Sequence, residues 1–217
     1  MNMSKAYIDR NGGTQYFEHF RGDVIDVVPA DAKYVLSVGC AAGRTEAELV
    51  NRGVKVVGVE IDPLAAQKAR ERGLTILEGD VAVIDINVSD EPYDCLVYAD
   101  VLEHLREPVD VLKRHVKHLK PNGIVYVCVP NFRCYSVFWQ LFVRGYARYS
   151  DEGVLDRTHI RITTRKMVLE WFRWAGIKPV SRKYFIHRRR DKLASVFLFG
   201  LAKEFIATQV GLVGTKR

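Results

Sequence analysis

Apolar residues occur along this chain in short unbroken runs separated by stretches with helical spacing. The runs are rich in Val, Ile and Leu, which is typical of strands buried on both faces of a parallel sheet. They cover residues 34–38, 54–59, 74–77, 93–98 and 123–129, and two more strand patterns follow at 178–186 and 207–215. Helical patterns lie at 14–28, 45–49, 64–72, 108–119, 163–175 and 193–205. This alternation predicts one α/β domain over residues 1–217, built on a doubly wound sheet of seven strands with helices on both faces.

The first strand runs directly into a glycine-containing turn. Gly39 and Gly43 flank the turn, and a helical pattern follows with Thr45 as a candidate N-cap. A turn without Cβ atoms lets a ligand approach the backbone, and a helix N-terminus offers amide donors to it. The second strand ends on Glu60, about twenty residues further on, where a carboxylate can accept hydrogen bonds from both hydroxyls of a ribose. The two features together predict a ligand that contains a nucleoside.

Asp80 follows the third strand at the same predicted edge of the sheet. A side chain at this place can read the amino group of an adenine, and beside the glycine turn and Glu60 we interpret Asp80 as a ligand contact. A turn or helix-cap aspartate is the alternative. Of the four cysteines, which show no metal-binding spacing, only Cys40 in the glycine turn is expected to touch ligand. The other three are expected to be structural thiols.

Several segments resemble the motifs of class I S-adenosylmethionine-dependent methyltransferases. They are residues 38–43, 57–62, 78–81 and 119–123. Three more, at 100–105, 129–131 and 156–161, resemble a bacterial subset that acts on small molecules or on sugar and lipid intermediates. The resemblance implies a Rossmann-like sheet, mostly parallel with an antiparallel closing strand, and S-adenosyl-L-methionine as cofactor with S-adenosyl-L-homocysteine as product. The chain departs from the family turn at Ser37, which replaces an acid, and at Ala41, which replaces a glycine and fits there if its φ is negative.

The resemblance also implies which residues contact the cofactor. Those expected at the methionine part are Gly39, Cys40 and Gly43, with Glu60 at the ribose. Those expected to flank the adenine are Ile61, Asp80 and Val81, with Ala99 and Asp100 near the sulfonium. A nicotinamide-binding Rossmann protein is the alternative for the same turn and strand-end acid, and Asp80 and the closing strands argue against it.

His159 is the candidate catalytic base. Methyl transfer is an in-line displacement, so alignment supplies much of the rate, and a base is needed only for a weak nucleophile such as a hydroxyl. His159 lies in a charged loop with Arg157 and Arg161, and Asp156 is available to orient its imidazole. A structural role for this loop is the alternative.

His104 is a second candidate for catalysis. With Asp100 and Glu103 it forms an Asp-x-x-Glu-His group that could ligate a divalent metal, completed by His159. Some methyltransferases with a similar Glu-x-x-Glu-His turn use a metal. Here the first acid is one methylene shorter, so we expect no metal and favour a capping or packing role for His104.

Residues 132–158 are rich in aromatic side chains and follow a strand at the expected ligand edge. We therefore expect this insertion to serve as a lid or substrate wall. The formal net charge is +7, and basic residues gather in the C-terminal third, most densely at 187–192. Such an excess favours an anionic partner, whereas a solvated face is the alternative.

These observations favour an O- or N-methyltransferase with a small or lipid- or sugar-linked acceptor, which is anionic if the basic residues contact it. An RNA methyltransferase is one alternative, but no dense basic cluster lies beside the aromatics of 132–158. A non-catalytic cofactor-binding protein is another, docking on anionic membranes through residues 187–205. A secretory signal and a long apolar segment are both lacking, which predicts a cytoplasmic protein. The sequence leaves the oligomeric state open.

Overall fold

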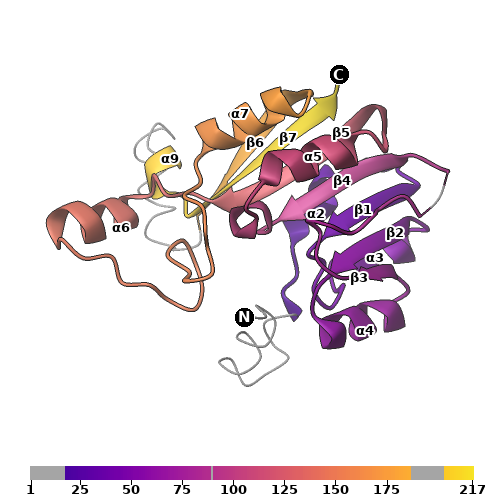
Figure 1. Ribbon diagram of the computed structural model, residues 1–217, viewed down its shortest axis with the longest axis horizontal. Helices are drawn as coiled ribbons and strands as arrows, with labels where there is room; N and C mark the ends of the chain where they lie inside the picture. The colour runs from indigo at the N-terminus through magenta and orange to yellow at the C-terminus, as the bar shows by residue number, and fades with distance from the viewer. Residues whose placement is uncertain (1–17, 89, 187–202) are drawn as a thin grey trace.

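The computed structural model describes residues 18–88, 90–186 and 203–217, and its seven strands form a single sheet in the order β3-β2-β1-β4-β5-β7-β6 (Figure 1). The strands are β1 Tyr34–Val38, β2 Lys55–Glu60, β3 Thr75–Glu78, β4 Tyr93–Ala99, β5 Leu119–Pro130, β6 Ile177–Phe185 and β7 Gln209–Lys216. Every pairing from β3 to β5 is parallel, and β7 is antiparallel to both of its neighbours. The predicted fold class is confirmed.

Helices cover both faces of the sheet (Figure 1). They are α2 Gly22–Val27, α3 Glu46–Asn51, α4 Pro63–Glu71, α5 Pro108–Val116 and α7 Arg165–Trp174, with a short α9 at Lys203–Ile206. Apolar residues of α5 and α7 belong to the larger core cluster, on one face of the sheet. Those of α2, α3 and α4 belong to a second cluster, on the other face. The alternation along β1 explains this division, because Leu36 points into the first cluster and Val35 into the second.

The carboxyl ends of the parallel strands meet at one edge of the sheet. The register pairs Val38 of β1 with Val59 of β2 and with Tyr98 of β4. It also pairs Glu60, the last residue of β2, with Glu78 at the end of β3. Residues that follow these strands are therefore brought together although they are far apart in the sequence.

Two local predictions require correction. The helix predicted over 14–28 is described only as α2, which begins at Gly22, and residues 14–17 lie outside the described residues. Thr45 occupies the N-cap position of α3, but its side chain does not cap that helix. Its Oγ1 instead accepts a hydrogen bond of 2.8 Å from the backbone amide of Arg21. This bond ties the segment before α2 to the glycine turn.

The aromatic insertion begins with α6 (Tyr135–Phe138), which continues as a π-helical segment, η3, at Trp139–Val143. In Figure 1 this part extends away from the sheet, at the left of the view. Several of its large apolar side chains are exposed, among them Phe138, Trp139 and Phe142. Phe138 and Phe142 stack on one another, with ring centroids 5.0 Å apart.

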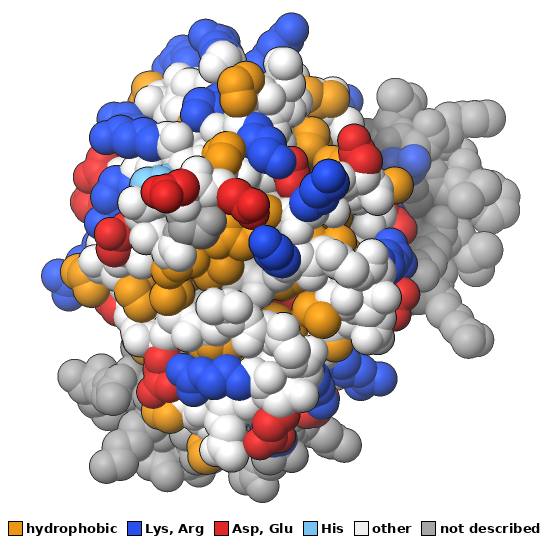
Figure 2. All heavy atoms as spheres, turned by 90° about the vertical axis from the view of Figure 1, so that its right-hand side faces the viewer, with side chains coloured by type: hydrophobic (Ala, Val, Ile, Leu, Met, Phe, Trp, Pro, Cys, Tyr) orange, Lys and Arg blue, Asp and Glu red, His pale blue; other side chains and the backbone are white. Residues whose placement is uncertain are grey.

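The densest basic cluster, at 187–192, lies outside the described residues, as does most of the helix predicted over 193–205. Figure 2 shows the face at the amino ends of the parallel strands, where basic and acidic side chains are interspersed around apolar ones. In the part of the chain that the structure describes, none of the helices has the length and apolar character needed to span a bilayer.

A buried histidine lies between α5 and the sheet. The Nδ1 atom of His115 is 2.8 Å from the hydroxyl of Tyr98, and its Nε2 is buried with no hydrogen-bond partner among the described residues. Burial, and then the charge of Arg114, lowers the pKa of His115 to about 3. The imidazole is therefore neutral in the folded protein at any mildly acidic pH.

We expect His115 alone to reduce the free energy of unfolding by about 2 kcal/mol between pH 7 and pH 5. The unfolded imidazole takes up a proton near its ordinary pKa of about 6.5, whereas the folded one stays neutral, so acid favours unfolding. Denaturant titrations of wild type and His115→Gln at both pH values measure the effect, because glutamine does not titrate. An equal decrease in the free energy of unfolding of the two proteins between pH 7 and pH 5 would contradict the assignment of this effect to His115.

Candidate functional site

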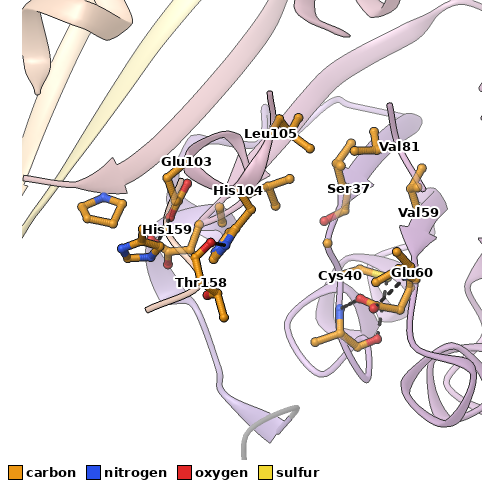
Figure 3. A pocket seen from close by; sticks show the side chains of 18 of the residues that line it. Ser37, Cys40, Val59, Glu60, Val81, Glu103, His104, Leu105, Thr158 and His159 are labelled. Atoms are coloured by element: carbon orange, nitrogen blue, oxygen red, sulfur yellow. Dashed lines mark hydrogen bonds and ion pairs between the residues drawn. The ribbon is translucent and has the colours of Figure 1, made fainter. Parts of the chain in front are cut away.

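A large pocket opens at the carboxyl ends of β1, β2 and β4, beside the glycine turn (Figure 3). The predicted site residues among its lining are Gly39, Cys40, Glu60, Ile61, Asp80, Val81, Ala99, Asp100, His104, Asp156 and His159. Figure 3 shows two groups on opposite sides, with Ser37, Cys40 and Glu60 on one side and Glu103, His104 and His159 on the other. The pocket is therefore divided into a wall formed by the glycine turn and a wall formed by the histidines.

Glu60 holds the glycine turn in place. Its Oε2 accepts a hydrogen bond of 2.8 Å from the amide of Ala41, and its Oε1 accepts bonds of 2.9 Å from the amides of Ile61 and Asp62. Three amides use most of the roughly four acceptor positions of a carboxylate, which leaves about one for a ligand. The side chain is 7% exposed, and burial raises its pKa while the three amides oppose that shift.

A second carboxylate lies under the same turn. Ser37, at the position where the family turn carries an acid, donates a hydrogen bond of 2.7 Å from Oγ to Oε1 of Glu46. Both residues are buried, and both line the pocket. Burial raises the pKa of Glu46, and the hydroxyl of Ser37 opposes the shift. The first turn of α3 thus supplies a carboxylate that β1 lacks.

The turn itself differs from expectation at two positions. Ala41 has φ +50°, in the left-handed region, so the negative φ at which an alanine fits this turn without strain is not the one that it adopts. Gly43, expected at the cofactor, is not among the residues that line the pocket. A Cβ on Gly43 would lie 3.0 Å from Cβ of Ala69 and 3.1 Å from Cδ2 of Leu74. Gly43 therefore allows the turn to pack against α4 and the chain before β3, outside the lining of the pocket.

The residues expected at the adenine lie together on one side of the pocket. Asp80 lines it, but its Oδ1 also accepts a 2.8 Å hydrogen bond from the amide of Ala82, as in the turn role considered as its alternative. Val81 is buried and Ile61 is partly exposed. Arg114 of α5 donates to the carbonyl oxygens of Val81 and Ala82 at 2.9 and 2.7 Å, which fixes this loop beside the pocket.

Asp100 is held by two side chains that are far away in the sequence. Its carboxylate forms a short ion pair with Arg21 and accepts a 2.7 Å hydrogen bond from Nε2 of Gln209. Asp100 has φ +58°, so the chain turns sharply after β4. Arg21 also pairs with Asp23 at 2.9 Å, and these carboxylates raise the pKa of its guanidinium against the opposing effect of burial.

On the opposite wall, the loop at 158–161 is bound to η2 (Leu102–His104). The backbone carbonyl of Glu103 accepts from the amides of Ile160 and Arg161, both at 3.2 Å. Nδ1 of His104 is 3.2 Å from the carbonyl oxygen of Thr158. These contacts place His159 beside His104, with ring centroids 4.9 Å apart. Nε2 of His159 faces Oε1 of Glu103 at 3.9 Å.

The sequence makes Asp156 available to orient the imidazole of His159, and the structure gives its Oδ1 another role. The Oδ1 atom of Asp156 accepts hydrogen bonds of 2.7 Å from both the amide and the hydroxyl of Thr158. The two ring nitrogens of His159 face other groups, Nδ1 the carbonyl of Val154 at 3.1 Å and Nε2 the carboxylate of Glu103. Asp156 therefore shapes the loop that carries the histidine.

The insertion predicted as a lid or substrate wall lines the pocket with only part of its length. Of residues 132–158, only positions 151–154, 156 and 158 line the pocket. The exposed aromatic side chains of α6, η3 and the residues up to Tyr149 do not line it. The wall contributed by the insertion is therefore polar, and it includes Asp151 and Glu152.

Three pocket residues were missed or underrated from the sequence. Arg21 gave no signal, because its partners Asp100 and Gln209 come from distant parts of the chain. Glu46 reads as an ordinary acid in the first turn of a helix, and only the neighbouring departure at Ser37 could have drawn attention to it. Glu103 was noted only as part of the group around His104, yet it is the most buried acid of the pocket, at 0% exposure.

Comparisons with known proteins agree with this geometry. The sequence matches the family described as Methyltransferase domain over residues 15–182. It is 27% identical over 175 residues to the ubiquinone biosynthesis O-methyltransferase of Cereibacter sphaeroides, covering 78% of this chain and 70% of that protein. The protein of the same name from Pectobacterium carotovorum is 28% identical over 178 residues, covering 77% and 71%. A solved SAM-dependent methyltransferase from Archaeoglobus fulgidus superposes with a TM-score of 0.69 at 13% identity, with 100% of each chain covered.

The family match extends over most of the chain, so this protein belongs to the methyltransferase-domain family. It is a class I methyltransferase that depends on S-adenosylmethionine, as the resemblance of its motifs implied. The predicted cofactor is thereby confirmed, and the nicotinamide alternative is wrong.

The left-handed alanine of the turn makes a prediction about stability. We expect Ala41→Gly to raise the free energy of unfolding by up to about 1 kcal/mol, because it removes the Cβ strain at φ +50°. Ala42, which is buried and not in the left-handed region, is the matched control. Ala42→Gly should lower the free energy of unfolding by about 1 kcal/mol or more. Thermal and urea unfolding measure the free energy of unfolding of both variants. Equal decreases in the two variants would refute strain at Ala41.

Proposed function

We propose that this protein transfers a methyl group from S-adenosylmethionine to an oxygen atom of a small-molecule acceptor. The observation that carries the proposal is the wall of Glu103, His104 and His159 opposite the glycine turn, which offers basic groups where an acceptor would lie (Figure 3). Amines are nucleophilic without such help, whereas a hydroxyl must lose its proton. The relatives named as O-methyltransferases support the same choice.

The glycine-turn side of the pocket suits the cofactor. S-adenosylmethionine carries an ammonium group and a sulfonium, which are cationic, and two ribose hydroxyls, which donate hydrogen bonds. The pocket presents the carboxylates of Glu46, Glu60, Asp80 and Asp100 on its lining. In our proposal Glu60 accepts a ribose hydroxyl with its remaining acceptor position, and Glu46 receives the ammonium group in place of the acid missing at Ser37.

A cationic ligand beside Glu46 also offsets the cost of its burial. In the protein alone, burial raises the pKa of this carboxyl, which disfavours the charged form. An ammonium group in contact with Glu46 would stabilise the ionised carboxylate, and the carboxylate would in turn stabilise the bound ammonium group. At Glu60 the proposed ligand groups are ribose hydroxyls, which are neutral. They would therefore offset the cost of burying that carboxylate only weakly.

Bound S-adenosylmethionine supplies a methyl group on a positively charged sulfur. The acceptor oxygen forms a bond to the methyl carbon as the carbon–sulfur bond breaks, with its electron pair left on sulfur, and the hydroxyl proton has to leave. The protein contributes alignment by fixing the cofactor from the glycine turn and the acceptor from the histidine wall. Asp100, held by Arg21 and Gln209, lies on the pocket lining as a fixed negative charge that favours a cationic cofactor.

Incubation with S-adenosylmethionine labelled on the methyl group tests the reaction. Simple phenols and catechols are offered beside anilines of the same shape, and the products are separated by mass spectrometry. We expect methyl ethers and S-adenosylhomocysteine in equal amounts, with no methylation of the anilines. Label found in the anilines, or only in transfer RNA added to a parallel sample, would overturn the proposal in favour of N-methylation or of an RNA substrate.

A further inference from the structure

Glu103 is a buried acid whose carboxylate lacks a hydrogen-bond partner. Its side chain is 0% exposed, and neither Oε1 nor Oε2 has a partner among residues 18–88, 90–186 and 203–217. The basic group that faces it, Nε2 of His159, is 3.9 Å from Oε1, too far for a hydrogen bond. Burying a carboxylate without a partner is costly, so such groups in proteins are paired, protonated or bound to a metal ion. The carboxylate therefore requires an explanation that the protein atoms do not give.

The two neighbouring histidines are oriented as metal ligands commonly are. Nδ1 of His104 lies 3.2 Å from the carbonyl of Thr158, and Nδ1 of His159 lies 3.1 Å from the carbonyl of Val154. A carbonyl can only accept, so each Nδ1 carries a hydrogen, and in the neutral imidazole the lone pair is then on Nε2. A hydrogen bond from the second ring nitrogen to a backbone carbonyl is the usual support of a histidine that binds metal.

One ligand atom from each of Glu103, His104 and His159 lies within 4.8 Å of the other two. Small side-chain rotations would bring such atoms to the distances of about 2.0–2.2 Å from a common ion that transition metals require. Asp100 is not a member of this set, since Arg21 and Gln209 already hold its carboxylate.

We propose that Glu103, His104 and His159 bind a divalent transition-metal ion at the histidine wall of the pocket. Two imidazole nitrogens and one carboxylate form a ligand set that suits Zn²⁺, Mn²⁺ or Fe²⁺, and leave coordination positions open for water or an acceptor. Mg²⁺ and Ca²⁺ prefer oxygen ligands throughout, so they should bind weakly. This replaces the sequence-based expectation of a site without metal.

The role of the ion rests on the proposed function. A cation at this wall lowers the pKa of a hydroxyl that contacts it, which prepares the acceptor for methyl transfer. In that case neither His104 nor His159 is a free base, and both serve as ligands. The proton of the acceptor is then released to water in the open pocket.

Metal binding can be tested without cofactor or acceptor. The full-length protein is stripped with a chelator and titrated calorimetrically with Zn²⁺, Mn²⁺ or Mg²⁺ alone. We expect one Zn²⁺ or Mn²⁺ ion per chain with micromolar or tighter affinity, and much weaker binding of Mg²⁺. Glu103→Gln and His159→Ala should each weaken binding by at least about 100-fold. His118→Ala, a histidine outside the pocket lining, should leave it unchanged.

Thermal unfolding gives a second measurement that does not depend on activity. Zn²⁺ should raise the melting temperature of the wild type but not that of Glu103→Gln. Without metal, Glu103→Gln should be at least as stable as the wild type, because the substitution removes a buried charge. Absence of binding to folded wild type, or binding that Glu103→Gln leaves intact, would overturn the proposal. The labelling experiment with phenols and anilines separates this outcome from failure of the proposed function, because methylated anilines would refute O-methylation whether or not the protein binds a metal ion.

Discussion

The site depends on the carboxylate of Glu60, which connects the ends of two strands. The carboxylate accepts hydrogen bonds from the backbone amide of Ala41 in the glycine turn and from those of Ile61 and Asp62 after β2. Hydrogen bonds to a charged acceptor each contribute roughly 1.5–3 kcal/mol, so together they offset part of the cost of burying the charge, although burial still raises the pKa of Glu60. The left-handed conformation of Ala41 is maintained against its own preference by this contact and by the packing of Gly43 on α4. The shape of the turn is thus set before any ligand arrives.

This constraint explains how the pocket tolerates its departures from the family turn. Ser37 leaves the end of β1 without a charge, and Glu46 returns one from the first turn of α3 through a hydrogen bond to the same serine. A carboxylate therefore lies beside the turn although the end of β1 carries none. The two carboxylates differ in their surroundings, since Glu60 is satisfied by backbone amides and Glu46 by a single hydroxyl.

The fold and the glycine-turn side of the pocket could be predicted from the sequence because both follow from local patterns. Apolar runs mark the strands, and parallel register brings Gly39, Glu60 and Asp80 to one edge. For the histidine wall, the sequence predicts which residues take part but not which of them contact one another. That the imidazole of His159 faces Glu103, while Oδ1 of Asp156 accepts from Thr158, depends on backbone hydrogen bonds between η2 and the loop at 158–161, which no spacing reveals. The path of the aromatic insertion away from the pocket likewise depends on tertiary packing.

Calorimetric titration with S-adenosylmethionine tests the central claim, that strand-end and turn carboxylates hold the cofactor. Wild type should bind S-adenosylmethionine but not NAD, and Glu60→Gln and Glu46→Gln should each weaken binding by about tenfold or more. Glu78→Gln is the control, because Glu78 ends the neighbouring strand, pairs with Arg70 and does not line the pocket. Unchanged affinity in folded Glu60→Gln, or a loss in Glu78→Gln of the same size, would contradict the account.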